Sequence, residues 1–304
     1  MKIAAINAVA ACLALVASPA FAAAYSSATL GTVTVTLIDL DPNDGVAASI
    51  SFLPNEIKYA GGAYLYGEAE TGLTGGYDPG HQLARYEKTG AWQTTNVSAS
   101  AHTNLATSSA SVTGSAAGPG FSALSLSGAA QSSSTDHARY YAYAGVPASH
   151  LNTGFILSAN TMVTFSFDAA VSANTTLGYT PGALEGEAAS ATLRLYAGAF
   201  GADDAAVLAG THEHSVSVMY QDGDVPGGAS DSWSGLMSAS FSNLGHQSGR
   251  GEFWAEASIG GRSVISAVPE PGAWGMLLAG LGLLGVVARR ASAQANRCLS
   301  RRMS

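Results

Sequence analysis

Apolar and polar residues alternate through most of the middle of this chain, and a period of two favours β-strands over helices. The segment 162–170 reads MVTFSFDAA, so Val163, Phe165 and Phe167 are expected to face inward. Four further stripes share this alternation: Val33, Val35 and Leu37; Ala191, Leu193, Leu195 and Ala197; Val216, Val218 and Tyr220; and Phe253, Ala255, Ala257 and Ile259. Clusters of Gly and Pro separate the stripes and are typical of turns. The pattern predicts an all-β, antiparallel, sandwich-like domain, with a final hairpin formed by 241–244 and 251–259.

One stretch of this domain, 94–135, consists almost entirely of Ser, Thr, Ala and Gly. Its composition leaves three interpretations open, namely strands of small residues, a flexible surface segment, or a segment that carries glycans.

The N-terminal 22 residues have the three parts of a cleavable signal peptide. Lys2 supplies a positive start, residues 3–16 are apolar apart from one Asn, and Ala20 and Ala22 form an A-x-A site. We therefore predict cleavage between Ala22 and Ala23. Two alternatives are a buried helix and a lipoprotein box that ends at Cys12.

The C-terminal end contains a rigid tetrapeptide followed by an apolar segment. Val268-Pro269-Glu270-Pro271 is held out of a helix by its two prolines. Residues 272–288 carry no charge, and Arg289-Arg290 closes the segment. This pattern predicts a short transmembrane helix over 272–288, a basic cytoplasmic tail over 291–304, and the domain 23–266 on the outer side of the membrane. A plain membrane anchor is the alternative.

These C-terminal residues resemble the PEP-CTERM sorting signal of Gram-negative bacteria. The resemblance covers about 267–290 and rests on the V-P-E-P motif, the Leu/Gly/Ala-rich helix and the basic cluster in fixed order. It implies processing by an exosortase in the inner membrane, a genome that makes exopolysaccharide, and delivery of the passenger to the cell surface or matrix. The tail departs from the family by extending to Ser304.

Cysteine and charge restrict the passenger further. Both cysteines, Cys12 and Cys298, lie outside it, so it is expected to fold without disulfides. Residues 23–270 contain seven basic and 21 acidic residues, which gives a net charge of −14. Such a surface repels nucleic acid and anionic lipid and keeps the protein soluble.

The loop after the first stripe contains Asp39, Asp41 and Asn43 at alternate positions, followed by Asp44-Gly45. This oxygen spacing is typical of calcium loops, although the glycine and the final glutamate of an EF-hand loop are missing. The alternative is an ordinary turn in which Gly45 adopts a positive φ.

Two polar pairs are weaker candidates. His212 and His214 flank Glu213 and would share one face of a strand, but no third metal ligand is identifiable, so an exposed strand edge is the simpler interpretation. Glu185 and Glu187 form an isolated carboxylate pair, for which a solvated strand face is expected.

The segment 139–143 reads RYYAY and concentrates aromatic side chains beside Arg139. Sugar rings stack on such side chains, whereas tyrosines also suit half-buried strands.

The sequence contains no nucleophile elbow, zinc-protease motif or phosphate loop, and we expect neither a cofactor nor enzymatic activity. The first hypothesis is a structural protein of the cell surface or extracellular matrix. A carbohydrate-binding or adhesive module is the alternative, and a secreted hydrolase is a third.

Overall fold

A computed structural model of the chain describes residues 23–53, 64–75, 78–91, 96–115, 118–132, 136–145, 154–176, 186–199, 210–219 and 228–263. All of these residues belong to one compact unit, Phe21–Ser266. In the described ranges the chain forms fifteen β-strands and no helix, and every strand pairing is antiparallel. The all-β, antiparallel class predicted from the alternation is therefore confirmed.

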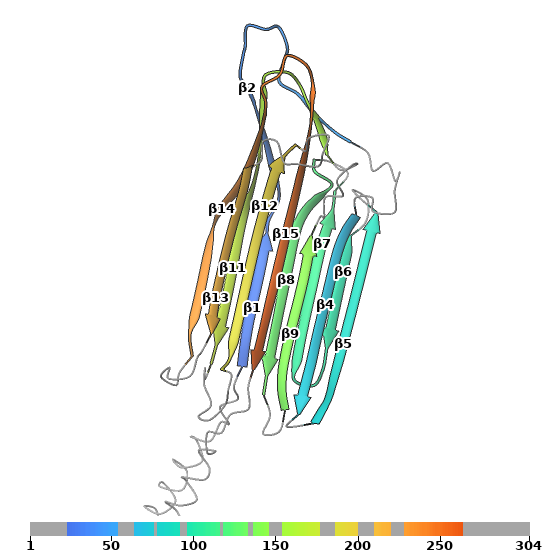
Figure 1. Cartoon of the computed structure of the whole chain (residues 1–304), viewed down its shortest axis with the longest axis vertical. Coiled ribbons are helices and arrows are strands. Elements are labelled where there is room, and N and C mark those ends of the chain that lie inside the picture. The colour runs from blue at the N-terminus through green and yellow to red at the C-terminus, as the bar shows by residue number, and fades with distance from the viewer. Residues whose placement is uncertain are drawn as a thin grey trace, which may run out of the picture. The chain divides into compact units, whose positions relative to one another are not determined.

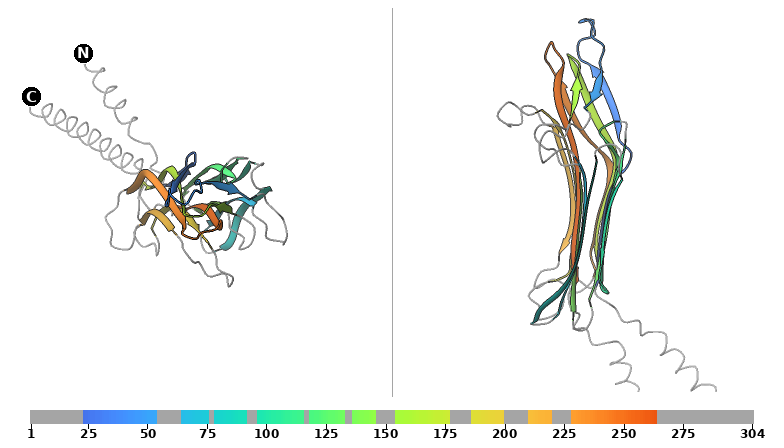
Figure 2. Two further views of the ribbon diagram at one scale, coloured as in Figure 1. Left: turned by 90° about the horizontal axis from the view of Figure 1, so that it is seen from above. Right: turned by 90° about the vertical axis from the view of Figure 1, so that its right-hand side faces the viewer.

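The strands form two sheets, which face each other in the turned views of Figure 2 (strand labels in Figure 1). The seven-stranded sheet has the order β14 (Ser230–Asn243), β11 (Thr161–Thr175), β1 (Ala23–Leu30), β8 (Phe121–Gln131), β7 (Ala106–Gly114) and β6 (Val97–His102), with β2 (Thr34–Asp39) also paired to β11. The eight-stranded sheet has the order β13 (Gly210–Met219), β12 (Ala188–Gly198), β15 (Gly249–Ser263), β9 (Asp136–Gly145), β4 (Tyr64–Gly75) and β5 (Asp78–Ala91), with β10 (Phe155–Leu157) paired to both β15 and β3 (Ile50–Phe52).

The core between the sheets follows the predicted stripes. Val163, Phe165 and Phe167 are at most 1% exposed, and the stripes on β12 and β15 are buried in the same way. Val216 and Val218 are buried as well, while Tyr220 lies outside the described residues. Alternation thus identified the inner face of each of these strands, because successive side chains of a strand point to opposite faces.

The predicted final hairpin is wrong. β14 and β15 follow each other in the chain, but β14 pairs with β11 in the first sheet and β15 pairs with β12 and β9 in the second. The connection is held by Asn243, whose Nδ2 donates to the carbonyl oxygens of Ser158 at 2.9 Å and Gln247 at 2.8 Å. Alternation specifies which face of a strand is buried, but it does not specify the neighbour with which the strand pairs.

A one-residue bulge separates β1 from β2 along β11. Leu30 pairs with Ala169 and Thr34 with Ser166, so three residues of one strand oppose two of the other. The bulge changes the parity of the buried positions. Even-numbered residues face inward in β1, whereas Val35 and Leu37 pack against the core from β2. The extra residue therefore keeps the apolar side of both segments directed into the sandwich.

The stretch 94–135 contains β6, β7 and β8, so its described residues form strands of small side chains. Alternate positions such as Ala99, Ala110 and Leu126 are buried, and the outward Ser109 and Ser127 join their hydroxyl groups across β7 and β8 at 2.8 Å. The hypothesis of attached glycans stays a prediction.

Both ends of the chain, 1–22 and 264–304, lie outside the described residues. The expected signal peptide, the Val268–Pro271 motif, the helix over 272–288 and the Arg289-Arg290 pair all fall there, together with the tail 291–304. Where the structure does describe the chain, it has no helix long and apolar enough to cross a membrane.

Candidate functional site

The outer face of the eight-stranded sheet has a row of charged residues across three strands. Arg194 on β12 stands in register with Glu213 on β13 and Glu256 on β15. Its guanidinium nitrogens lie 2.7 Å from a Glu213 oxygen and 2.9 Å from a Glu256 oxygen. The hydrogen bond from Arg194 to Glu213 raises the pKa of Arg194, and the charges of both glutamates add to this effect. Sequence reasoning missed this row, because its members come together only through strand register.

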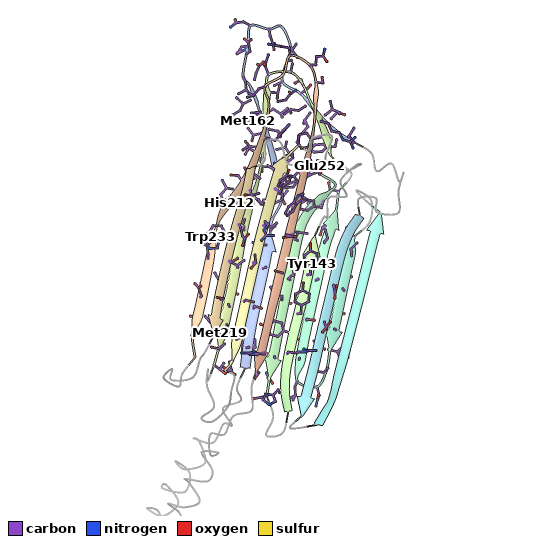
Figure 3. All side chains as sticks on the ribbon, in the orientation of Figure 1. Tyr143, Met162, His212, Met219, Trp233 and Glu252 are labelled. Carbon is purple, nitrogen blue, oxygen red and sulfur yellow. The ribbon has the colours of Figure 1, made fainter. Side chains whose placement is uncertain are left out.

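The aromatic segment 139–143 lies on β9 and is divided between the two faces of the sheet. Tyr140 faces the core, where its hydroxyl group and Ser26 Oγ are 2.8 Å apart and burial raises the pKa of the phenol. Tyr141 is 40% exposed on the outer face. Tyr143, labelled in Figure 3, lies on the same face and donates its hydroxyl proton to Glu256 at 3.0 Å. The predicted aromatic patch therefore keeps two of its three tyrosines on the outer surface.

The outward tyrosines lie in an acidic neighbourhood. Partial burial raises the pKa of Tyr141, and the negative charges of Glu68, Glu256 and Glu70 raise it further. Arg139 adds a positive charge to this neighbourhood, with a guanidinium nitrogen 3.9 Å from Glu70 Oε1. This surface combines one exposed ring with groups that can donate and accept hydrogen bonds.

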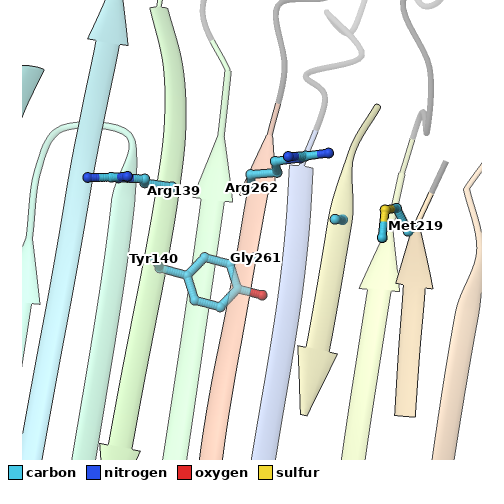
Figure 4. A pocket seen from close by; sticks show the side chains of 6 residues that line it. Arg139, Tyr140, Met219, Gly261 and Arg262 are labelled. Carbon is cyan, nitrogen blue, oxygen red and sulfur yellow. The ribbon is translucent and has the colours of Figure 1, made fainter. Parts of the chain in front are cut away.

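A shallow hollow of about 340 Å³ adjoins this surface (Figure 4). It is lined by Arg139, Tyr140, Ala188, Met219, Gly261 and Arg262. The two arginines are direct partners in the pairing of β9 with β15, but their side chains extend in different directions. Arg139 reaches across Gly72, and Arg262 Nε donates to the carbonyl oxygen of Gly186 at 3.1 Å. The guanidinium groups therefore flank the hollow and do not converge on one point in it.

Of the three calcium candidates, Asp39 ends β2, and Asp41 and Asn43 lie in the turn that follows. The carboxylates of Asp39 and Asp41 make local contacts with the backbone of this turn. Asp39 Oδ1 accepts the N–H of Asp41 at 3.0 Å, and Asp41 Oδ1 accepts the N–H of Asn43 at 3.2 Å. Gly45 has a φ of 76°, as the turn interpretation requires. These contacts favour the turn, and calcium binding stays a prediction that the structure does not test.

Asp44 in this turn makes the longer-range contact. Asn160 Nδ2 donates to its Oδ2 at 2.8 Å, and the N–H of Val46 donates to its Oδ1 at 2.7 Å. The bond from Asn160, followed by that from Val46, lowers the pKa of Asp44.

The two histidines do share one face of β13, as predicted, but this face points toward the neighbouring sheet. His212 Nδ1 accepts the backbone N–H of Ser238 on β14 at 3.2 Å. His214 stacks on Trp233 with 3.9 Å between ring centroids. The expected exposed edge is therefore partly covered, and the imidazoles join the outer strands of the two sheets. Among the described residues, no three His, Cys, Asp or Glu side chains are grouped so as to hold a metal ion.

Glu187 contradicts the expected solvated carboxylate pair. Its side chain is completely buried just before β12, and its Oε2 accepts the N–H of Thr176 at 3.1 Å. Thr176 also accepts the N–H of Ala23 on its Oγ1 at 2.9 Å. Glu185 lies outside the described residues, as does Ala22 on the other side of the predicted cleavage bond. No sequence pattern connects Ala23 with Thr176 and Glu187, which lie more than 150 residues along the chain.

Comparison with known proteins identifies the C-terminal end. Residues 267–291 match the family model of the PEP-CTERM protein-sorting motif. This range contains the Val268–Pro271 tetrapeptide, the apolar segment and Arg289-Arg290, so the resemblance found in the sequence is confirmed. No curated protein and no solved structure matches the chain. The motif indicates a secreted protein that passes through the membrane and is processed by an exosortase.

Proposed function

We propose that this chain is a non-enzymatic structural protein of the cell surface or extracellular matrix, delivered there by exosortase processing and associated with exopolysaccharide. The observation that carries the proposal is the match of residues 267–291 to the sorting motif. A sorting signal of this kind directs the passenger to the outer side of the inner membrane. An acidic domain without cysteines stays soluble there and folds without forming disulfides.

The passenger supports a structural role through the way its polar side chains are used. Hydroxyl groups bond to one another across neighbouring strands, as in Ser27 with Ser172 at 2.8 Å and Thr164 with Ser240 at 2.8 Å. The outward Arg194 also connects neighbouring strands, through ion pairs with Glu213 and Glu256. These contacts stiffen the sheets, which suits a protein whose task is to keep its shape in a matrix.

The sorting end works through rigidity and charge in this proposal. Pro269 and Pro271 keep the tetrapeptide extended, which is a conformation that a protease cleft can bind. The charge of Glu270 resists transfer into hydrocarbon, and Arg289-Arg290 holds the other end on the cytoplasmic side. The motif is thereby presented to the membrane enzyme at a fixed depth. Cleavage beside it would release the passenger or join it to a surface acceptor.

The experiment is fractionation and intact-mass analysis in hosts with and without exosortase. We expect loss of residues 272–304 only where exosortase is present. Glu270→Ala, or Pro269→Ala together with Pro271→Ala, should leave the full-length chain in the inner membrane. Pro226→Ala, which removes a proline outside the motif, is the matched control and should be processed normally. Removal of Arg289 and Arg290 should instead reduce retention and correct orientation before processing.

Two results would contradict the proposal. If the mature protein keeps residues 272–304 in both hosts, the C-terminal end is a plain anchor. If the purified passenger degrades a polymer, and replacing one acid such as Glu256 abolishes the turnover, the protein is a hydrolase.

A carbohydrate-binding role is the second candidate, and the exposure of Tyr141 beside Arg139 favours it. A sugar ring can stack on the phenol while its hydroxyl groups bond to the arginine and to neighbouring carboxylates. Binding to a glycan array should then be weakened at least tenfold by Tyr141→Ala. Tyr140→Phe is the control, because that ring faces the core. Equal binding by the wild type and Tyr141→Ala would remove this candidate.

A further inference from the structure

Ala23 begins β1 at the bond where the signal peptide is expected to be cut. The residue is 2% exposed, and its N–H donates to Thr176 Oγ1 at 2.9 Å. The N–H of Thr176 in turn donates to the carbonyl oxygen of Ala23 at 3.0 Å. A reciprocal pair of hydrogen bonds therefore fastens the start of β1 to the residue that follows β11.

A buried carboxylate lies at the same place. Glu187 is 0% exposed, and its Oε2 accepts the N–H of Thr176 at 3.1 Å. Thr176 thus contacts both the nitrogen of Ala23 and the carboxylate of Glu187. The two groups therefore share Thr176 as a common hydrogen-bond partner. A buried carboxylate is strongly stabilised when a positive charge pairs with it.

We propose that Glu187 and Thr176 form the binding site for the α-ammonium group that cleavage creates at Ala23. Hydrolysis of the Ala22–Ala23 amide consumes one water, leaves a carboxylate on Ala22 and gives Ala23 a primary amine. This amine takes up a proton at neutral pH. One of its N–H groups keeps the bond to Thr176 Oγ1, and another turns toward Glu187. The uncleaved chain offers only an uncharged amide N–H at this position.

The surrounding structure keeps the carboxylate in place. Arg262 on β15 is in register with Ala188 and donates its Nε to the carbonyl oxygen of Gly186, so the backbone on both sides of Glu187 is fixed. β1 pairs with β8 on one side and β11 on the other. An added contact at its first residue therefore stabilises both pairings, and removal of the signal peptide completes the fold of the passenger.

The inference rests on cleavage after Ala22 and is independent of the passenger's role at the surface. Its test uses the processed chain, Ala23–Ser304, purified in detergent from a host without exosortase and checked by intact mass. A variant with one extra alanine inserted between Ala22 and Ala23 keeps the charge of the new terminus but displaces it by one residue. We expect the melting temperature of the inserted variant to fall by about 5 °C or more. In a Glu187→Gln background, which retains the acceptor for Thr176, the insertion should cause no further fall.

Glu252→Gln is the matched control, because Glu252 is also a buried glutamate. It lies on β15 and pairs with Gly198, the last residue of β12, whereas Glu187 lies just before the first residue of β12. The effect of the insertion should persist in that background. Selective acetylation of the α-amine removes the charge without changing chain length, and it should reproduce the fall in the wild type alone. The proposal is overturned if insertion and acetylation leave the melting temperature unchanged, if Glu187→Gln does not suppress their effects, or if the mature chain begins at another residue.

Discussion

The core of the sandwich is built in two different ways in two of its regions. Around β10, β11 and β15 the sheets are separated by a phenylalanine cluster, formed by Phe52, Phe121, Phe155, Phe165, Phe167, Phe241 and Phe253. Around β4 and β6 they meet through an alanine cluster, formed by Ala69, Ala99 and Ala101. The rings bury a large apolar area for each residue, whereas the alanines bury little but let the backbones approach.

Close approach gives the alanine region a different kind of bond. Ser108 of β7 reaches across to the other sheet and donates to the backbone carbonyl oxygen of Glu70 on β4 at 3.0 Å. A side chain as short as serine can make this contact only where the sheets lie near each other. In the phenylalanine cluster, by contrast, Phe165 and Phe253 stack across the core with 4.2 Å between ring centroids. The comparison shows that one sandwich can be held by apolar area in one region and by short-range packing and hydrogen bonds in another.

The largest expected effect is that of Phe165→Ala. The side chain is completely buried and contacts Phe52, Phe155 and Phe253, so its loss removes apolar contacts and leaves a cavity. The free energy of unfolding should fall by about 3–5 kcal/mol, as measured by denaturant titration. Phe165→Leu should cost less than half as much. A loss no greater than that of an alanine-to-glycine change in β6 would refute the contrast between the regions.

A middle-sized effect is expected at Gly128 on β8. A methyl group there would overlap the ring of Tyr140, which is fixed by its contact with Ser26. Gly128→Ala should therefore lower the free energy of unfolding by about 1–3 kcal/mol through overpacking. Gly260→Ala is the matched control on the outer face, where the nearest atom lies at 3.8 Å, and it should be nearly neutral. If Gly128→Ala lowers the free energy of unfolding no more than Gly260→Ala does, the sheets accommodate the added methyl group and the expected overlap with Tyr140 is wrong.

The smallest effect is expected in the alanine cluster. Ala99→Gly removes one buried methyl group from β6 and adds backbone freedom to the unfolded chain, so it should cost roughly 0.5–1 kcal/mol. Ser100→Gly on the exposed face of the same strand separates the backbone contribution from that of packing. A cost for Ala99→Gly that approaches the cost of Phe165→Ala would mean that close packing, and not buried area, dominates the whole core.

The sequence by itself determined the all-β class, the inner face of five strands (β2, β11, β12, β13 and β15) and the C-terminal sorting signal. Strand faces were predictable because side-chain direction has a fixed period of two, as in Val163, Phe165 and Phe167. The sorting signal was predictable because its parts are contiguous. Strands also proved to be the outcome for the described part of 94–135, where composition alone had left the choice open.

Only the tertiary structure decided which strands pair and which distant groups meet. It placed β14 and β15 in different sheets, divided Tyr140 from Tyr141, and joined Arg194 to Glu213 and Glu256 through register. It also buried Glu187 beside Thr176, where a solvated carboxylate was expected. Each of these results depends on pairing between segments far apart in the chain, and local alternation carries no information about the partner of a strand.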